Sequence, residues 1–233
     1  MMSRRSRREM DNEILLKNSV KTLVANIRFA SVDKALQTLV VTSSVPDEGK
    51  STISVELARA LAVGGRNVLV VEGDMRRRTL AGLLGVHSKS GLYGVLSGQA
   101  ALDESALRVH GKSTLWFLDA EPHIPNPVDI FSSRRFHRFM ESLRHLYDYV
   151  IFDTPPLSAF VDAAVLASMA DGTLLVVREN LVKREEITAA YDQLRKAEAN
   201  VIGAVVNCSG VNHSEYYRYR SYAHKSDRSD EKG

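Results

Sequence analysis

Residues 43–52 read SSVPDEGKST, and this stretch decides the fold. It follows the apolar run QTLVVT at 37–42 and leads into a segment at 50–62 that has the pattern of a helix. A strand, a short loop and Gly-Lys-Ser at the start of a helix form the context of a phosphate-binding loop. There, backbone N–H groups and the helix amino terminus surround phosphate oxygens. The stretch therefore predicts a P-loop, with Ser44 in place of the first of the two usual glycines.

The second half of this loop has the chemistry to bind a nucleoside triphosphate. Gly49 lets the backbone come close to phosphate, Lys50 adds a mobile positive charge, and the Ser51 hydroxyl can bind Mg²⁺. Asp47 and Glu48 bring carboxylates into the loop, which weakens phosphate binding unless they point to solvent. The expected ATP contacts within the loop are Glu48, Gly49, Lys50, Ser51 and Thr52.

Two further apolar runs end in carboxylates. Residues 68–76 read VLVVEGDMR, and because side chains alternate along a strand, Glu72 and Asp74 are expected to project together toward the loop edge. Residues 149–156 read YVIFDTPP, a run that closes on Asp153. An aspartate at such a place can hold Mg²⁺ opposite a P-loop, directly or through water. The three motifs together predict a site for Mg·ATP.

Strand-like and helix-like segments alternate through the chain. Apolar or β-branched runs lie at 37–42, 67–71, 114–118, 149–152, 173–177 and 201–206. Helix-like segments lie at 13–30, 50–62, 136–147 and 182–198. Continuous apolar runs are typical of strands buried on both faces, and their alternation with helices indicates a parallel sheet with right-handed crossovers. We predict a doubly wound α/β fold, a mostly parallel sheet with helices on both faces and its ligand at the carboxyl ends of the strands.

The composition bounds the class of protein. The chain has 233 residues, of which 44% are hydrophobic and 25% charged, as in a globular domain. Residues 1–10 hold four arginines and one glutamate, and the net charge of the whole chain is +3. The remainder is therefore balanced, which gives no support to a nucleic-acid partner. The single cysteine excludes an internal disulfide and a Cys-x-x-Cys metal site. These features favour a cytoplasmic protein.

The sequence divides into three parts. Residues 1–12 are expected to be a disordered basic arm, residues 13–208 the P-loop domain, and residues 209–233 a flexible polar tail. Half of the chain's eight tyrosines lie within seven residues of this tail, so we interpret them as functional. They are Tyr216, Tyr217, Tyr219 and Tyr222.

These motifs resemble those of the bacterial tyrosine kinases of capsule and exopolysaccharide synthesis, which are MinD/ParA-like P-loop ATPases. Residues 45–51 are similar to the family's Walker A sequence, residues 72–76 to its Walker A′ sequence Asp-x-Asp-x-Arg, and residues 152–156 to its Walker B sequence. Asn126-Pro127 resembles the dipeptide before the family's next helix. The tail tyrosines resemble the cluster that these kinases phosphorylate on themselves. The resemblance covers about residues 14–222.

The resemblance implies a function and a set of site residues. The function is that of an ATP- and Mg²⁺-dependent protein-tyrosine kinase that autophosphorylates its tail and regulates capsular or exopolysaccharide synthesis and export. Glu72 or Asp74 is the expected base for the tyrosine hydroxyl. The implied catalytic residues are Lys50, Glu72, Asp74, Arg76 and Asp153; the implied metal ligands are Ser51, Asp74 and Asp153; and Asn207 is expected at the adenine.

The resemblance also implies partners. Activation is expected from the cytoplasmic tail of a membrane polysaccharide co-polymerase, which would place the chain at the inner face of the membrane, and dephosphorylation from a cognate tyrosine phosphatase. Self-association is expected, although Asn18, Lys21 and Val24 replace the Glu-x-x-Arg-x-x-Arg of the family's subunit contact, which gives no support to its ring-shaped assembly. Glu72 stands where the family has aspartate, and Asp47 replaces a glycine of the loop.

Two alternatives stay open on the sequence. A MinD/ParA-like ATPase switch, which binds a membrane or a partner in its ATP state, shares the fold and the three motifs. The basic arm favours this switch, whereas the tyrosine tail and Val45, in place of the signature lysine of partitioning ATPases, favour the kinase. A catalytically weak scaffold that docks on a membrane partner is compatible with Asp47 and Glu72.

Overall fold

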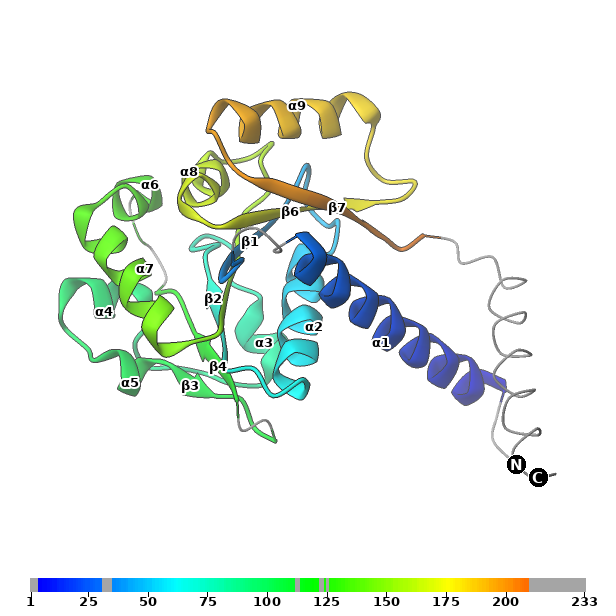
Figure 1. The fold of residues 1–233 in the computed structure, drawn as a ribbon, viewed down its shortest axis with the longest axis horizontal. Helices are drawn as coiled ribbons and strands as arrows, with labels where there is room; N and C mark the ends of the chain where they lie inside the picture. Colours follow the sequence, from blue (N-terminus) through cyan, green and yellow to red (C-terminus); the bar gives the residue numbers. More distant parts are fainter. Residues whose placement is uncertain (1–3, 31–34, 112–113, 122–123, 125, 210–233) are drawn as a thin grey trace.

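A seven-stranded sheet forms the centre of the protein. The computed structural model describes residues 4–30, 35–111, 114–121, 124 and 126–209, and within these residues the strand order is β3-β4-β2-β5-β1-β6-β7 (Figure 1). The strands are β1 (Thr38–Ser43), β2 (Val68–Glu72), β3 (Leu107–Arg108), β4 (Leu115–Leu118), β5 (Tyr149–Asp153), β6 (Gly172–Arg178) and β7 (Val201–Asn207). All neighbours pair in parallel except β3, which runs antiparallel to β4. The predicted doubly wound, mostly parallel α/β fold is confirmed.

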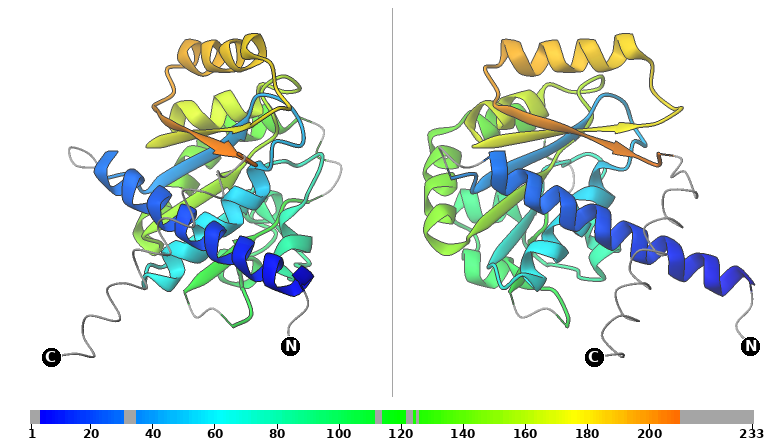
Figure 2. Two further views of the ribbon diagram at one scale, coloured as in Figure 1. Left: turned by 90° about the vertical axis from the view of Figure 1, so that its right-hand side faces the viewer. Right: turned by 45° about the vertical axis from the view of Figure 1, so that its right-hand side comes forward.

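Helices cover both faces of this sheet (Figures 1 and 2). They are α1 (Arg4–Ala30), α2 (Lys50–Val63), α3 (Leu80–Leu84), α4 (Leu92–Ser97), α5 (Leu102–Ser105), α6 (Pro127–Phe131), α7 (Arg134–Leu146), α8 (Asp162–Met169) and α9 (Arg184–Lys196). Alternate residues of β1 belong to different cores. Leu39 and Val41 pack with α1, α2 and α3, whereas Val40 packs with α4, α6, α7, α8 and α9. Two apolar layers therefore fix the sheet between the helices.

The strand order brings the three sequence motifs to one edge of the sheet. β1 pairs with β5, so that Val41 lies opposite Asp153, and β5 pairs with β2, so that Glu72 lies opposite Asp153. The P-loop follows β1 directly and ends at the first residue of α2. In parallel sheets the ligand lies beyond the carboxyl ends of the strands, and this edge carries the candidate residues.

The amino-terminal helix differs from the expectation. We predicted a disordered arm at 1–12 and a helix from residue 13, but α1 extends from Arg4 to Ala30. The physical reason is that no glycine or proline interrupts this range, which holds five arginines and three leucines, residues that favour helices. Ile27, near the end of α1, packs into the core that contains α2. The tail cluster Tyr216, Tyr217, Tyr219 and Tyr222 lies outside the described residues.

Candidate active site

The P-loop wraps around the start of α2. Gly49 is the residue before this helix and has φ of 89°, in the left-handed region that glycine tolerates. A Cβ on Gly49 would lie 2.2 Å from Asn207 Nδ2, so a larger residue there would displace the Asn207 side chain. Asn207 Nδ2 donates to the Glu48 carbonyl at 2.9 Å. Asn207 thus lies against the backbone of the loop, and its contact with adenine stays a prediction.

One acidic residue of the loop is buried and the other is exposed. Glu48 is fully buried, and its carboxylate accepts hydrogen bonds from the backbone N–H of Val45 at 2.8 Å and of Arg178 at 3.0 Å. Asp47 is exposed, has φ of 64°, and forms an ion pair with Arg77 at 3.2 Å. The Glu48 carboxylate therefore holds the loop to the end of β6, and that of Asp47 is neutralised at the surface.

The two carboxylates after β2 have different surroundings. Glu72 is fully buried, and its Oε2 accepts from the backbone N–H of Thr79 at 2.8 Å and of Leu80 at 3.0 Å, at the start of α3. Burial, and then the charge of Asp153, raise the pKa of Glu72 to about 8. Asp74 lines the pocket described below, with Oδ2 3.9 Å from Lys50 Nζ. Both carboxylates accept hydrogen bonds from the segment after β2, at the expected edge, but only that of Asp74 lines the pocket.

Asp153 is buried behind the P-loop. Its Oδ1 accepts from the Ser54 hydroxyl at 2.9 Å, and its Oδ2 is buried without a hydrogen-bond partner among the described residues. Burial raises the pKa of Asp153 to about 6, while Lys50 and the Ser51 hydroxyl act in the opposite direction. A buried carboxylate oxygen without a partner, next to a serine hydroxyl, fits the oxygen ligands or water contacts of Mg²⁺. The donor set is therefore compatible with the predicted metal.

Arg76 is fixed by two neighbours, one in the loop after β5 and one at the start of α8. Its Nη1 lies 2.7 Å from Asp162 Oδ2, and its guanidinium carbon lies 3.8 Å from the centre of the Phe160 ring. The Asp162 side chain is buried, whereas Arg76 and Phe160 line the pocket. An ion pair and a cation–π contact on one guanidinium restrict its rotamers.

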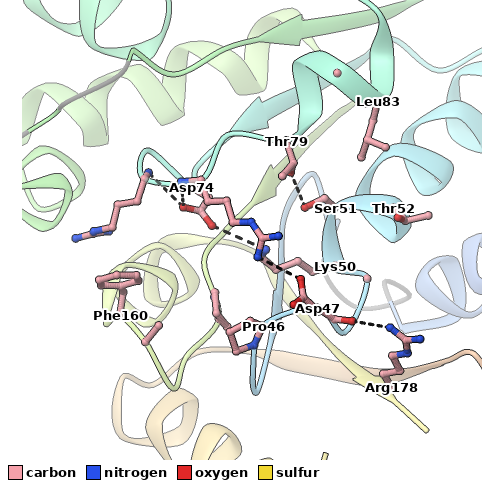
Figure 3. Close-up of a pocket in the computed structure, with 16 residues that line it drawn as sticks. Pro46, Asp47, Lys50, Ser51, Thr52, Asp74, Thr79, Leu83, Phe160 and Arg178 are labelled. Carbon is pink, nitrogen blue, oxygen red and sulfur yellow. Dashed lines mark hydrogen bonds and ion pairs between the residues drawn. The ribbon is translucent and has the colours of Figure 1, made fainter. Parts of the chain in front are cut away.

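These groups surround a cavity of about 660 Å³ (Figure 3). Its floor is the start of α2, where Lys50, Ser51 and Thr52 lie. Asp74 and Phe160 lie on one side of Lys50 in Figure 3, and Leu83 lies on the other. The Ser51 hydroxyl accepts from that of Thr79 at 2.9 Å, which ties the P-loop to α3. The cavity thus combines phosphate-binding groups, a carboxylate and an apolar side.

Comparison with known proteins places the chain in a family. Residues 36–201 match the AAA domain family. The chain is 34% identical to the tyrosine-protein kinase YwqD of Bacillus subtilis over 200 residues, 85% of this chain and 84% of YwqD. It is 31% identical to the tyrosine-protein kinase CpsD of Streptococcus agalactiae over 212 residues, 91% and 90% of the two chains. The chain belongs to the bacterial tyrosine-protein kinases.

Solved structures agree with this family. The kinase domain of the Escherichia coli tyrosine kinase ETK superposes with a TM-score of 0.77 at 30% identity, covering 82% of this chain and 74% of that one. The chimerical protein CapA2B2 superposes with a TM-score of 0.76 at 30% identity, covering 80% of this chain and 82% of that one. The septum site-determining protein MinD of Pyrococcus horikoshii, solved with Mg-ADP, superposes with a TM-score of 0.64 at 23% identity, covering 75% of this chain and 71% of that one. This likeness shows a shared fold. The P-loop ATPase fold of this tyrosine-kinase family member is thereby established.

The structure brings together most of the residues predicted for this kinase. The predicted residues that line the pocket are Gly49, Lys50, Ser51, Thr52, Asp74 and Arg76. Glu48, Glu72, Asp153 and Asn207 lie around it without lining it. Asp153 interacts with Ser51 and Lys50, which line the pocket. Both oxygens of Glu72, in contrast, accept hydrogen bonds from the backbone. Of the two candidate bases, the geometry favours Asp74.

Sequence reasoning missed three residues of this kinase's site. Asp162 and Phe160 fix Arg76, and the backbone N–H of Arg178 binds Glu48. An aspartate at the start of a helix, shortly after a strand that ends in the Walker B aspartate, was the available signal for Asp162. For Phe160 and Arg178 the sequence carries no local signal, because their contacts join segments far apart in the chain.

Proposed function

We propose that this chain is an ATP- and Mg²⁺-dependent protein-tyrosine kinase that phosphorylates its own tail tyrosines and regulates capsular or exopolysaccharide synthesis and export. The observation that carries the proposal is the convergence at the P-loop of Lys50, Asp74 and Asp153, whose Oδ2 has no hydrogen-bond partner among the residues that the structure describes. A nucleotide switch shares these groups, so the tail tyrosines and the similarity to the tyrosine-protein kinases YwqD and CpsD are what favour the kinase over the switch.

The hydroxyl of the acceptor tyrosine is a weak acid, and the kinase has to remove its proton. At pH 7 about one tyrosine hydroxyl in a thousand is ionised, a cost of about 4 kcal/mol. In the proposed step the tyrosine Oη forms a bond to the γ-phosphorus of ATP, the bond from that phosphorus to the ADP oxygen breaks, and the phenolic proton passes to the Asp74 carboxylate. Lys50 lies within 3.9 Å of Asp74 and stabilises negative charge on the phosphate oxygens. ADP and phosphotyrosine are the products.

The chain's own residues would hold the metal and the nucleotide. Ser51, Asp74 and Asp153 would hold Mg²⁺, which when bound neutralises charge on the phosphate oxygens. The backbone of Glu48, Gly49 and Thr52 would bind phosphate at the start of α2. Arg76, fixed by Asp162 and Phe160, adds a second cation at the acceptor side of the pocket.

The proposed partners follow from the family. Among the described residues no helix is long and apolar enough to span a bilayer. We assign activation and membrane placement, at the inner face, to the cytoplasmic tail of a polysaccharide co-polymerase, and removal of phosphate to a cognate tyrosine phosphatase. Self-association provides a second copy whose tail reaches the site, and no nucleic acid takes part. Activity of the chain alone is expected to be low and to rise when the activator's tail is added.

A mixing experiment tests the proposal. A Lys50→Met chain, which cannot bind ATP, is incubated with a chain whose four tail tyrosines are phenylalanine, together with Mg·ATP and the activator's tail. Mass spectrometry is expected to find phosphate on the tail of the Lys50→Met chain, because transfer occurs between subunits. Lys89→Met, an exposed lysine outside the pocket, is the matched control and should label itself like wild type.

Each other outcome has a defined meaning. If wild type labels its tail but the mixture stays unlabelled, transfer between subunits is wrong and transfer within one chain takes its place. If wild type never labels tyrosine while calorimetry shows that it binds Mg·ATP, the kinase proposal fails and the nucleotide switch replaces it.

A further inference from the structure

The pocket has an apolar side that phosphate binding does not explain. Pro156, Ala159 and Phe160, in the loop between β5 and α8, line it there. Phe160 is 38% exposed, although it is a large hydrophobic residue. Triphosphate and Mg²⁺ call for N–H groups, hydroxyls, carboxylates and cations. The adenine of ATP is expected at Asn207, at the end of β7, and β1 and β6 lie between β7 and β5. An exposed aromatic ring on the β5 side of the cavity therefore indicates a second ligand with an apolar part.

This apolar side is held in place relative to the P-loop. The backbone N–H of Leu157 donates to the Ser43 carbonyl at 2.9 Å, and that of Ser158 to the Ser44 carbonyl at 3.0 Å. The Thr42 hydroxyl donates to the Pro155 carbonyl at 3.0 Å. The loop after β5 is thus bonded to the end of β1 and to the start of the P-loop. A ligand on this side is therefore positioned relative to the phosphates without rearrangement of the backbone.

Arg76 links the apolar side to the candidate base. It follows Asp74 by two residues, and its guanidinium lies over one face of the Phe160 ring at 3.8 Å. The buried Asp162 carboxylate holds that guanidinium at 2.7 Å, so the ring and the cation form one fixed unit. The exposed part of the Phe160 ring therefore belongs to the Asp74 side of the cavity, whereas Leu83 lies on the other side of Lys50 (Figure 3).

We propose that Phe160, with Pro156 and Ala159, forms the subsite for the phenol ring of the acceptor tyrosine. The inference rests on the proposed kinase function and names residues that bind its substrate. A tyrosine whose hydroxyl reaches Asp74 must place its ring beside that carboxylate, and the apolar surface available there is that of the β5–α8 loop. Aromatic rings gain from edge or offset contact with another ring as well as from burial. Phe160 is then a specificity-determining residue that selects an aromatic acceptor.

A peptide titration tests the subsite separately from catalysis. The probe is a synthetic peptide of residues 213–224, HSEYYRYRSYAH, added to the full chain loaded with Mg·ADP, so that no turnover occurs. Calorimetry is expected to show a Kd about tenfold weaker for Phe160→Ala than for wild type, and within twofold for Phe160→Tyr, which keeps the ring. Mg·ADP binding should be the same in all three proteins, because the ring does not contact the phosphates.

Leu83→Ala is the matched control, because Leu83 is 44% exposed and lines the same cavity away from Phe160. It should leave peptide binding unchanged. The subsite is overturned if Phe160→Ala binds the peptide as wild type does, if Leu83→Ala weakens it equally, or if wild type shows no binding at millimolar peptide. If Phe160→Ala weakens the peptide while wild type phosphorylates no tyrosine under any condition, the subsite stands and the kinase proposal fails.

Discussion

The two ends of the central sheet use buried carboxylates in opposite ways. At the amino edge, Asp171 accepts from the backbone N–H and the hydroxyl of Thr38 at 2.9 and 2.8 Å, and forms an ion pair with Arg144 at 2.6 Å. At the carboxyl edge, Asp153 is equally buried, but its Oδ2 has no partner within the described residues. The first carboxylate is satisfied inside the chain. The second keeps one oxygen open to a group from outside the described part of the chain.

The pKa shifts of these two groups show the same difference. Burial raises the pKa of each, but for Asp171 the bonds from Arg144 and Thr38 outweigh it and the pKa is lowered. For Asp153 burial outweighs Lys50 and the serines, and the pKa rises to about 6. A buried carboxylate with a full set of donors stabilises the fold, whereas one without them lowers stability and marks a functional position. The contrast predicts opposite consequences for the same substitution.

Asp153→Asn should have the largest functional effect. It removes the negative charge that we propose binds Mg²⁺, so the affinity for Mg·ATP is expected to fall by more than about 100-fold, or about 3 kcal/mol. The free energy of unfolding should fall by no more than about 1 kcal/mol, because an incompletely satisfied buried charge is lost. Calorimetry with Mg·ATP and urea denaturation measure the two quantities. A large loss of stability with unchanged affinity for Mg·ATP would contradict the assignment, because Asp153 would then stabilise the fold and not bind the metal.

Asp171→Asn should show the opposite pattern. Breaking the buried pair with Arg144 is expected to cost about 3 kcal/mol, which lowers the Tm by about 6–12 °C for a chain of this size. The affinity for Mg·ATP should change less than twofold, since Asp171 lies at the far end of β1 from the P-loop. Thermal unfolding of nucleotide-free protein and calorimetry below the new Tm provide the two measurements.

The pH dependence of the same variant checks its cause. A carboxyl whose pKa is lower in the folded than in the unfolded chain stabilises the fold above the unfolded pKa of about 4, and this contribution is lost as the pH falls through the folded pKa. The stability difference between wild type and Asp171→Asn should therefore be constant between about pH 5 and 8 and shrink below about pH 4. A difference independent of pH would assign the effect to lost packing instead of lost charge.

The sequence predicts the layers of this fold better than its edges. β1, β5 and α2 lie within one or two residues of their predicted ranges, because continuous apolar runs and a P-loop have strong local signals. α3 to α6 have four to six residues each, too few to show a helical period; α3 to α5 were not predicted, and a helix after Asn126-Pro127 was expected only from the resemblance. The antiparallel β3 is only two residues long. Its pairing depends on the neighbouring β4, which no local pattern records.

The site shows the same limit. The motif order was enough to bring Lys50, Asp74 and Asp153 together, because the carboxyl ends of adjacent strands share an edge. The different surroundings of Glu72 and Asp74 were not predicted, because β2 ends at Glu72, where strand alternation stops, and the backbone N–H of Gly73 bonds to the Asp153 carbonyl at 2.7 Å. The contact of Arg76 with Asp162 joins residues 86 positions apart. Only the folded chain reveals such a partner.

The smallest effect is expected for Asp47, which shares the carboxyl edge with Asp153 but is exposed. Its side chain and that of Arg77 are each 69% exposed, and exposed pairs contribute about 0–1 kcal/mol. Glycine also accepts the φ of 64° at this position, so Asp47→Gly should fold normally and change the Mg·ATP affinity less than threefold. Arg77→Ala is the matched control, because it removes the same ion pair from the other side. If both variants stay near wild type, burial, and not the edge of the sheet alone, distinguishes the functional carboxylates. A tenfold change for Asp47→Gly but none for Arg77→Ala would instead add Asp47 to the nucleotide contacts.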